Sequence, residues 1–294
     1  MAQRVTLTSN QIDLAWSGGT TPGYRLLVGS SAGNSDIGSI DTTQTSYTFV
    51  APRTANTYYA RVVGISGAAS GAASRELTIT TLDLRSVIDA LFFRAGPLSP
   101  GKAVQLGSIQ AGVWPDGTHL RVLVSREAGE SRRAEAQAAV DDYASTVDGA
   151  ITGTAELVDD DLHSLVLSQV PPFTIAIRVI PGFCGASALG CESGGPAPIG
   201  PNSSIVTLHS PSLTSVAAHE LGHAYGLFHI TGAPVGALFG SFLMNPTATA
   251  DITMSPAEKA AIGAGHAGGI RAGTTRDQAL ASGLVLPYAI GAVR

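Results

Sequence analysis

Runs of roughly alternating apolar and polar residues fill the first 81 positions of the chain. Turn-forming Gly, Pro, Asn and Asp residues separate each run from the next. A period of two is typical of β-strands that bury one face. The runs with this pattern are residues 5–8, 12–16, 24–28, 46–50, 58–63 and 76–80. Residues 1–81 are therefore predicted to fold as an all-β antiparallel sandwich.

After position 81 the apolar residues recur at helical spacing, and strand-like runs lie between the helical segments. Leu84, Val87, Ile88 and Leu91 follow the spacing of an amphipathic helix. The predicted helices are residues 82–93, 130–147 and 213–225, and the predicted strands are residues 119–125, 173–180 and 204–209. This order of elements predicts an α/β domain with a twisted sheet over residues 82–294.

Composition and charge exclude several classes of protein. Hydrophobic residues make up 44% of the chain and charged residues 13%, so enough apolar surface is present to build folded cores. The net charge of −5 provides no electrostatic attraction to nucleic acid, so nucleic-acid binding is not expected. The longest apolar runs, such as residues 173–180, are too short to span a bilayer. The first residues alternate and do not form an apolar stretch, so we expect no signal peptide in this chain.

Two cysteines, Cys184 and Cys191, flank a Gly-rich segment. Their close spacing predicts a disulfide, which the loop-entropy model expects to stabilise the fold by about 2.5 kcal/mol. Two buried free thiols are the alternative, and a zinc-binding role is disfavoured because histidines elsewhere supply the ligands. A disulfide favours a secreted or extracytoplasmic location.

The strongest chemical signal is the run of residues 219–229, His-Glu-Leu-Gly-His-Ala-Tyr-Gly-Leu-Phe-His. His219 and His223 are four residues apart, so on a helix both imidazoles can reach a single ion. Gly226 can end that helix with a positive φ, and the turn can bring His229 to the same ion. Zinc accepts neutral imidazole nitrogens in tetrahedral sites, so we predict one catalytic zinc with a fourth position left for water.

This run resembles the zinc motif of the metzincins, H-E-x-x-H-x-x-G-x-x-H, at every defined position. Residues 241–246, Ser-Phe-Leu-Met-Asn-Pro, are similar to the Met-turn of that family, with Met244 as the hydrophobic base beneath the zinc ligands. Taken alone, Met244 would be an ordinary core methionine. Pro246 stands where some metzincins carry a tyrosine, so we expect no tyrosine assistance from this turn. The resemblance implies a metzincin-like catalytic domain and a zinc metalloendopeptidase.

Glu220, next to the first histidine, is the predicted general base. A zinc-activated water attacks the scissile carbonyl, and Glu220 accepts the water proton and delivers it to the leaving amine. The alternative for Glu220 is a solvated helix carboxylate with no catalytic role.

The resemblance also implies where a protein or peptide substrate binds. In metzincins the strand before the active-site helix pairs with extended substrate, so residues 204–208 are expected to do so here, with contacts from Val206 and Leu208. The segment before the Met-turn is expected to form a pocket that prefers an apolar residue just after the scissile bond. The predicted pocket residues are Leu238, Phe239 and Phe242.

The N-terminal segment resembles a fibronectin type III domain. Trp16 matches the tryptophan of the second strand of that fold, and residues 58–62 match its tyrosine-bearing sixth strand. Trp16 is interpreted as a core residue, and no ligand site is predicted in the segment. Such a domain is expected to act as a spacer, to bind a surface or a glycan, or to cover the catalytic domain.

Other readings of the sequence stay open. A narrow-specificity processing protease or a zinc amidohydrolase acting on a non-protein amide would use the same motif. A binding protein without activity would also keep the fold, although the intact Glu220 argues against it. Structural calcium at the three aspartates of residues 159–161 is unsupported, because the alternating ligands of known calcium loops are missing. His119, His163 and His266 carry no ligand spacing. His209 ends the strand before the active-site helix, where it could lie near the cleft, but a structural role is the favoured interpretation.

Overall fold

The computed structural model describes residues 3–5, 11–17, 19–52, 56–81, 83–93, 102–211, 215–230, 242–245 and 253–287. The chain divides into two compact units, Met1–Leu84 and Arg85–Arg294. The division falls three residues after the predicted boundary, where helix α1 (Leu84–Phe93) begins. Among the described helices, none has the length and apolar character needed to cross a membrane.

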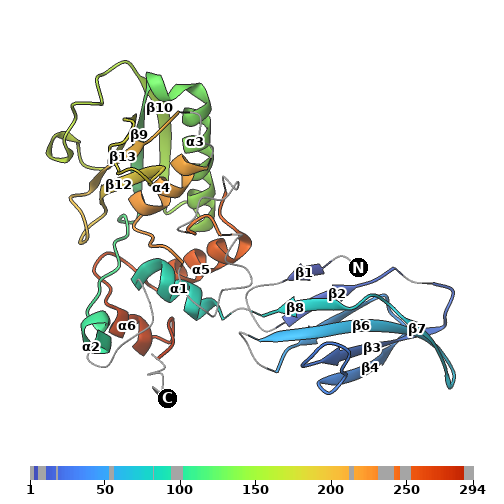
Figure 1. Ribbon diagram of the computed structural model, residues 1–294. Helices are drawn as coiled ribbons and strands as arrows, with labels where there is room; N and C mark the ends of the chain where they lie inside the picture. The colour runs from blue at the N-terminus through green and yellow to red at the C-terminus, as the bar shows by residue number, and fades with distance from the viewer. Residues whose placement is uncertain are drawn as a thin grey trace. The chain divides into compact units, whose positions relative to one another are not determined.

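The first unit is a β-sandwich of two antiparallel sheets (Figure 1). One sheet has the strand order β1-β2-β5, and the other has the order β4-β3-β6-β7 with β8 also paired to β6. Buried side chains of both sheets, among them Ile12, Leu26 and Phe49, form a single hydrophobic core. The predicted sandwich is confirmed. Its strands are β1 (Gln3–Val5), β2 (Gln11–Ala15), β3 (Gly23–Gly29), β4 (Gly38–Thr42), β5 (Ser46–Val50), β6 (Thr57–Ser66), β7 (Ala69–Ala73) and β8 (Leu77–Thr80).

Strands β4 and β7 were not predicted from the sequence. Both consist mainly of small and polar residues, and β7 is exposed at every position, so neither carries an alternating apolar signal. They form because the backbones of β3 and β6 pair with them. Trp16 is a core residue as predicted, and its ring packs edge-on against Tyr24 with ring centroids 5.8 Å apart.

The second unit contains a five-stranded sheet with the order β10-β9-β11-β13-β12. Four strands are parallel, and β12 is antiparallel to β13. Strands β11 and β13 are buried at all six of their positions. Among the described strands, β12 lies at one edge of this sheet. The strands are β9 (Thr118–Ser125), β10 (Ile151–Val158), β11 (Thr174–Val179), β12 (Gly190–Gly195) and β13 (Ser203–Leu208).

Helices accompany this sheet, and α3 connects the parallel neighbours β9 and β10 (Figure 1). The observed α1 and α3 agree with the predicted helices at residues 82–93 and 130–147. Strands β10 and β12 were not predicted. The described helices after α1 are α2 (Lys102–Gly107), α3 (Gly129–Thr146), α4 (Val216–Ala224), α5 (Pro256–Ala267) and α6 (Arg276–Ala281). Short 3-10 turns lie at Arg126–Ala128 and Leu167–Gln169.

Helix α4 is held in place by several neighbours in the same unit. The rings of Tyr143 on α3 and Tyr225 at the end of α4 stack with centroids 4.0 Å apart and planes 7° apart. The indole N–H of the buried Trp114 donates to the carbonyl of Ala224 at 3.1 Å. These contacts fix the C-terminal end of α4, the helix that carries His219, Glu220 and His223.

Candidate metal centre

Helix α4 lies between two residues with positive φ. Ser215 precedes it with φ 68°, and Gly226 follows it with φ 87°. A Cβ at Gly226 would lie 1.9 Å from the carbonyl oxygen of Gly112, so only glycine fits there. The described helix begins at Val216, three residues later than predicted.

The first turn of α4 is bound by a carboxylate from α3. Oε1 of Glu135 accepts the backbone N–H of Ala218 at 3.1 Å. Glu135 is buried and forms an ion pair with the equally buried Arg132. A negative charge at a helix N-terminus is stabilised by the helix dipole. The ion pair therefore fixes the start of the helix, as the tyrosine stack fixes its end.

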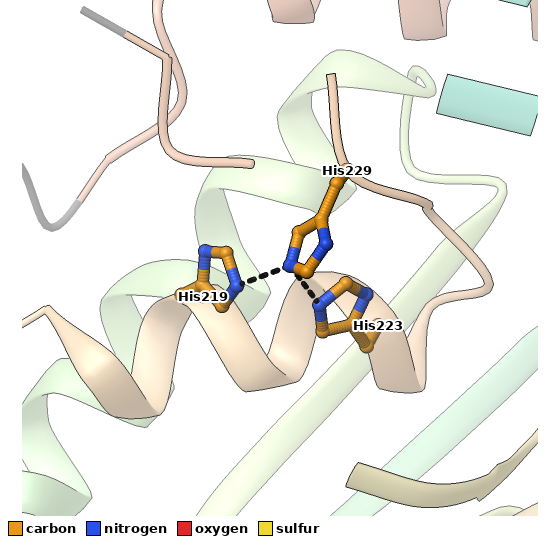
Figure 2. Close-up of side chains that lie close together, drawn as sticks. All are labelled: His219, His223 and His229. Atoms are coloured by element: carbon orange, nitrogen blue, oxygen red, sulfur yellow. Dashed lines mark hydrogen bonds between the residues drawn. The ribbon is translucent and has the colours of Figure 1, made fainter. Parts of the chain in front are cut away.

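The three motif histidines converge on one point (Figure 2). Nε2 of His229 lies 3.1 Å from Nε2 of His219 and 3.1 Å from Nε2 of His223. His219 and His223 come from one face of α4, and His229 comes from the segment after the Gly226 turn. Among the described residues, no other group of three His, Cys, Asp or Glu side chains converges in this way.

Hydrogen bonds to backbone carbonyls fix which ring nitrogens of two histidines carry the proton. Nδ1 of His219 lies 2.7 Å from the carbonyl oxygen of Leu243, and Nδ1 of His223 lies 2.8 Å from that of Leu227. A carbonyl oxygen only accepts, so both Nδ1 atoms are donors and both Nε2 atoms carry a lone pair in the neutral ring. Burial lowers the pKa of His219, which favours this neutral form.

This donor set fits a zinc ion. Zn–N bonds of about 2.0–2.1 Å at tetrahedral angles place ligand nitrogens about 3.3 Å apart, close to the 3.1 Å separations between the Nε2 atoms. The lone pairs on Nε2 of His219 and His223 both lie close to Nε2 of His229. These nitrogens repel one another unless a cation or a proton lies between them. The backbone carbonyls that accept the Nδ1 protons also orient the rings, as outer partners do in zinc sites.

The turn around Met244 lies directly against the zinc motif. Met244 is fully buried, and a Cβ added at Gly222 on α4 would lie 2.2 Å from its sulfur. The turn also supplies the carbonyl of Leu243 that accepts from His219. The carbonyl of Met244 accepts the N–H of Ile230, the residue after His229, at 2.9 Å. The turn therefore contacts both parts of the histidine cluster.

Glu258 binds this turn from the first turn of helix α5. Its carboxylate accepts the backbone N–H groups of Leu243 at 3.0 Å and Met244 at 2.8 Å. It also accepts the N–H of Ser255 at 2.7 Å, as part of the capping box that begins α5. Glu258 has no exposed surface, and burial raises the pKa of its carboxyl group. Sequence reasoning did not identify this residue.

A cleft of about 450 Å³ adjoins the histidines. Its lining includes Glu220, His223 and His229, together with Glu192 of strand β12. Burial, and secondly the negative charge of Glu192, raises the pKa of Glu220 to about 7. The structure therefore brings the predicted base and two of the three predicted ligands, His223 and His229, to one cleft, and adds a second carboxyl group that was not predicted.

The predicted substrate contacts need correction. Strand β13 pairs with β11 on one side and β12 on the other, so residues 204–208 have no free edge for a substrate strand. Val206 and Leu208 are fully buried. Phe242 is also fully buried and does not line the cleft. The expectation was wrong because β12 precedes β13 in the sequence yet lies outside it in the sheet.

The predicted pocket residues Leu238 and Phe239 lie outside the described residues, as does Pro246.

The three aspartates of residues 159–161 include two with local partners. Asp159 forms an ion pair with Arg126, and the carboxylate of Asp161 accepts the backbone N–H of His163.

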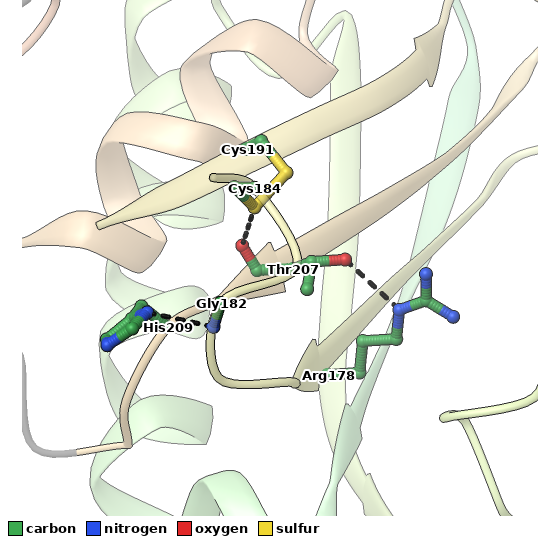
Figure 3. Close-up of a disulfide and its surroundings, with 6 residues drawn as sticks. All are labelled: Arg178, Gly182, Cys184, Cys191, Thr207 and His209. Carbon is green, nitrogen blue, oxygen red and sulfur yellow. Dashed lines mark hydrogen bonds between the residues drawn. A yellow bond between two sulfur atoms is a disulfide. The ribbon is translucent and has the colours of Figure 1, made fainter. Parts of the chain in front are cut away.

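Cys184 and Cys191 form the predicted disulfide (Figure 3). Cys191 belongs to β12 and lines the cleft, so the bond ties the preceding loop to this edge strand. The same loop is bound by His209, whose Nδ1 accepts the N–H of Gly182 at 3.0 Å (Figure 3). His209 thus has a structural partner, as expected.

The other histidines also lie away from the cluster. His163 pairs with Glu127, and His266 pairs with Asp116. His119 is exposed and contacts the hydroxyls of two threonines.

Comparison with known proteins gives similarity to fibronectin type III domains. No family model matches the sequence, and no curated protein matches it. One match is a crystal structure of the chicken CNTN1 FN1-FN3 domains, with 18% sequence identity and a TM-score of 0.25. The matched region covers 28% of this chain and 30% of the chain in that structure. The chain therefore spans less than a third of the length of that structure. Another match is the solution structure of the sixth fibronectin type III domain from human fibronectin type III domain containing protein 3, with 24% sequence identity and a TM-score of 0.23. The matched region covers 33% of this chain and 87% of that domain's chain.

Proposed function

We propose that this protein is a zinc-dependent endopeptidase whose second unit is a metzincin-like catalytic domain. The observation that carries the proposal is the convergence of three Nε2 atoms from His219, His223 and His229 beside the carboxyl group of Glu220. The motif that holds them has the full H-E-x-x-H-x-x-G-x-x-H spacing.

The three histidines would hold the ion, and the turn around Met244 would keep them oriented. When bound, zinc supplies a Lewis acid that polarises a carbonyl group and acidifies water. Glu220 lies in the same cleft with a pKa of about 7, so near neutral pH it can accept a proton and release it again. Glu220 is therefore assigned as the general base, and as the acid that returns the proton to the leaving amine.

An extended peptide would bind along strand β12, because β12 is the edge strand of the described sheet and four of its residues line the cleft that holds Glu220: Gly190, Cys191, Glu192 and Gly194. Backbone pairing with a free sheet edge binds peptides with little dependence on sequence. Side chains in the cleft would then select the substrate. The preference for an apolar residue just after the scissile bond stays a prediction.

The location and the role of the first unit follow as part of the same proposal. The disulfide beside the cleft favours an oxidising, extracytoplasmic compartment. The β-sandwich is proposed to be a fibronectin type III-like domain that serves as a spacer, an anchor to a surface or glycan, or a cover for the catalytic unit.

Metal analysis combined with peptide cleavage tests the proposal. Wild-type protein and Glu220→Gln are each expected to bind one zinc per chain, because Glu220 is not a ligand. Only the wild type should cleave a mixed peptide library, and loss of the base should lower the rate by about 10²–10⁴-fold. Glu127→Gln, on the surface outside the cleft, is the matched control. Zinc binding by the wild type without any cleavage of peptides would overturn the peptidase assignment. Cleavage confined to cell-wall or glycan amides would redirect it to an amidohydrolase.

A further inference from the structure

The carboxyl group of Glu192 lines the same cleft as Glu220 but has no part in the proposed proton transfers. Glu192 is half-buried on edge strand β12, where it pairs with Val206 of β13. The hydroxyl of Ser204 donates a hydrogen bond to its Oε1, which orients the carboxylate. Ser204 is itself completely buried. Glu192 is therefore a fixed acidic group and not a mobile surface side chain.

Glu192 and Glu220 face one another across the junction of β12 and α4. A Cβ at Gly190 would lie 2.9 Å from Cγ and 3.0 Å from Oε1 of Glu220. Residues 190 and 192 point to the same face of the strand, since side chains alternate along it. The side chain of Glu192 thus lies on the face of β12 that packs against the zinc motif.

The proposed zinc ion would lie at the histidines, and the described part of the cleft offers Glu192 no Lys or Arg partner of its own. Burial raises the pKa of Glu192, the hydrogen bond from the Ser204 hydroxyl opposes this rise, and no basic side chain is among the causes. A half-buried carboxylate without a cationic partner attracts one strongly, because the local dielectric constant is lower than that of water.

We propose that Glu192 selects peptide substrates that carry a basic side chain, above all arginine, at a position flanking the scissile bond. A guanidinium group offers paired N–H donors that match a carboxylate, so arginine gains more than lysine from such a partner. This inference rests on the proposed peptidase function for its substrate class. It assigns a specificity role to a residue of the edge strand along which the substrate would run.

The test compares peptides that differ only in charge. Quenched peptides carry arginine or its neutral isostere citrulline at each position from three residues before to three residues after the cleaved bond. The zinc-loaded wild type is expected to prefer arginine at one position by about tenfold or more, which corresponds to about 1.4 kcal/mol. Glu192→Gln keeps an oxygen to accept from Ser204 and should bring this ratio close to one. Glu127→Gln should keep the wild-type ratio.

The outcomes separate this inference from the proposed function. Cleavage with no arginine preference, or a preference unchanged in Glu192→Gln, would overturn the role of Glu192 while the peptidase assignment stands. If the wild type cleaves no peptide, the proposed function fails, and equilibrium binding of the same peptides by fluorescence anisotropy decides about Glu192. Tighter binding of the arginine peptide that is lost in Glu192→Gln supports the inference, and equal binding of both peptides overturns it.

Discussion

Replacing Glu258 by methionine should weaken both the fold and the zinc site. Methionine has an unbranched chain of similar length but no strong acceptor, so Glu258→Met removes the acceptor of three backbone N–H groups. Two of those groups belong to the turn around Met244, which is completely buried. Water has no exposed route to replace the carboxylate, because Glu258 has no exposed surface.

The magnitude follows from these three hydrogen bonds. A buried donor left without a partner costs about 1–3 kcal/mol. Relief from burying a carboxyl group offsets part of the loss, so we expect the free energy of unfolding to fall by about 2–5 kcal/mol. The loosened turn would also release the carbonyl of Leu243, which orients His219. Loss of such an outer partner lowers metal affinity by about 10–100-fold.

Two assays measure these effects separately. Chemical denaturation of the metal-free protein reports stability, and competition with a coloured chelator at a temperature where both variants are folded reports zinc affinity. Glu130→Gln, an exposed position on α3, is the control. Glu258→Gln keeps one acceptor oxygen and should fall between the wild type and Glu258→Met. Unchanged zinc affinity in a destabilised Glu258→Met protein would refute the link between Glu258 and the histidines.

Three further predictions concern other contacts of the site. Glu135→Gln should destabilise the protein by about 3–5 kcal/mol in thermal or chemical denaturation, because it leaves Arg132 buried without its anionic partner; an unchanged midpoint would contradict this. Reduction of the Cys184–Cys191 disulfide should lower the free energy of unfolding by about 2.5 kcal/mol, seen by comparing denaturation with and without reductant. The base must be deprotonated to act, so kcat/KM should rise with pH along an acidic limb whose midpoint is at or below the Glu220 pKa of about 7. Glu192→Gln removes a negative charge that raises this pKa, so its acidic limb should move to lower pH, and a shift to higher pH would refute the assignment.

Local patterns predicted most of the elements and the histidine cluster. His219 and His223 are one helical turn apart, and Gly226 permits the turn that returns His229, so the geometry is encoded within 11 consecutive residues. The buried strands β11 and β13 were visible because, apart from Arg178, their residues are apolar or small. Strand β12, Gly-Cys-Glu-Ser-Gly-Gly, has no such pattern, and it forms because the backbone of β13 pairs with it.

The residues that support the site were not predictable from local patterns, because their contacts join distant segments. Glu135 reaches Ala218 across 83 positions, and Glu192 meets Ser204 only through the sheet. Glu258 showed a local signal, the Ser-Pro-Ala-Glu capping box. That box marks the start of α5 but gives no indication of the second role of the same carboxylate at Met244.

Zinc titration of the metal-free protein, followed by peptide cleavage, tests the central claim most directly. We predict no cleavage without zinc and a linear rise in activity that reaches a plateau at one equivalent per chain. His229→Ala should lose this response, and His119→Ala, an exposed histidine outside the cluster, should keep it. Peptide cleavage that is equal with and without zinc, or that survives in His229→Ala, would contradict a three-histidine zinc peptidase.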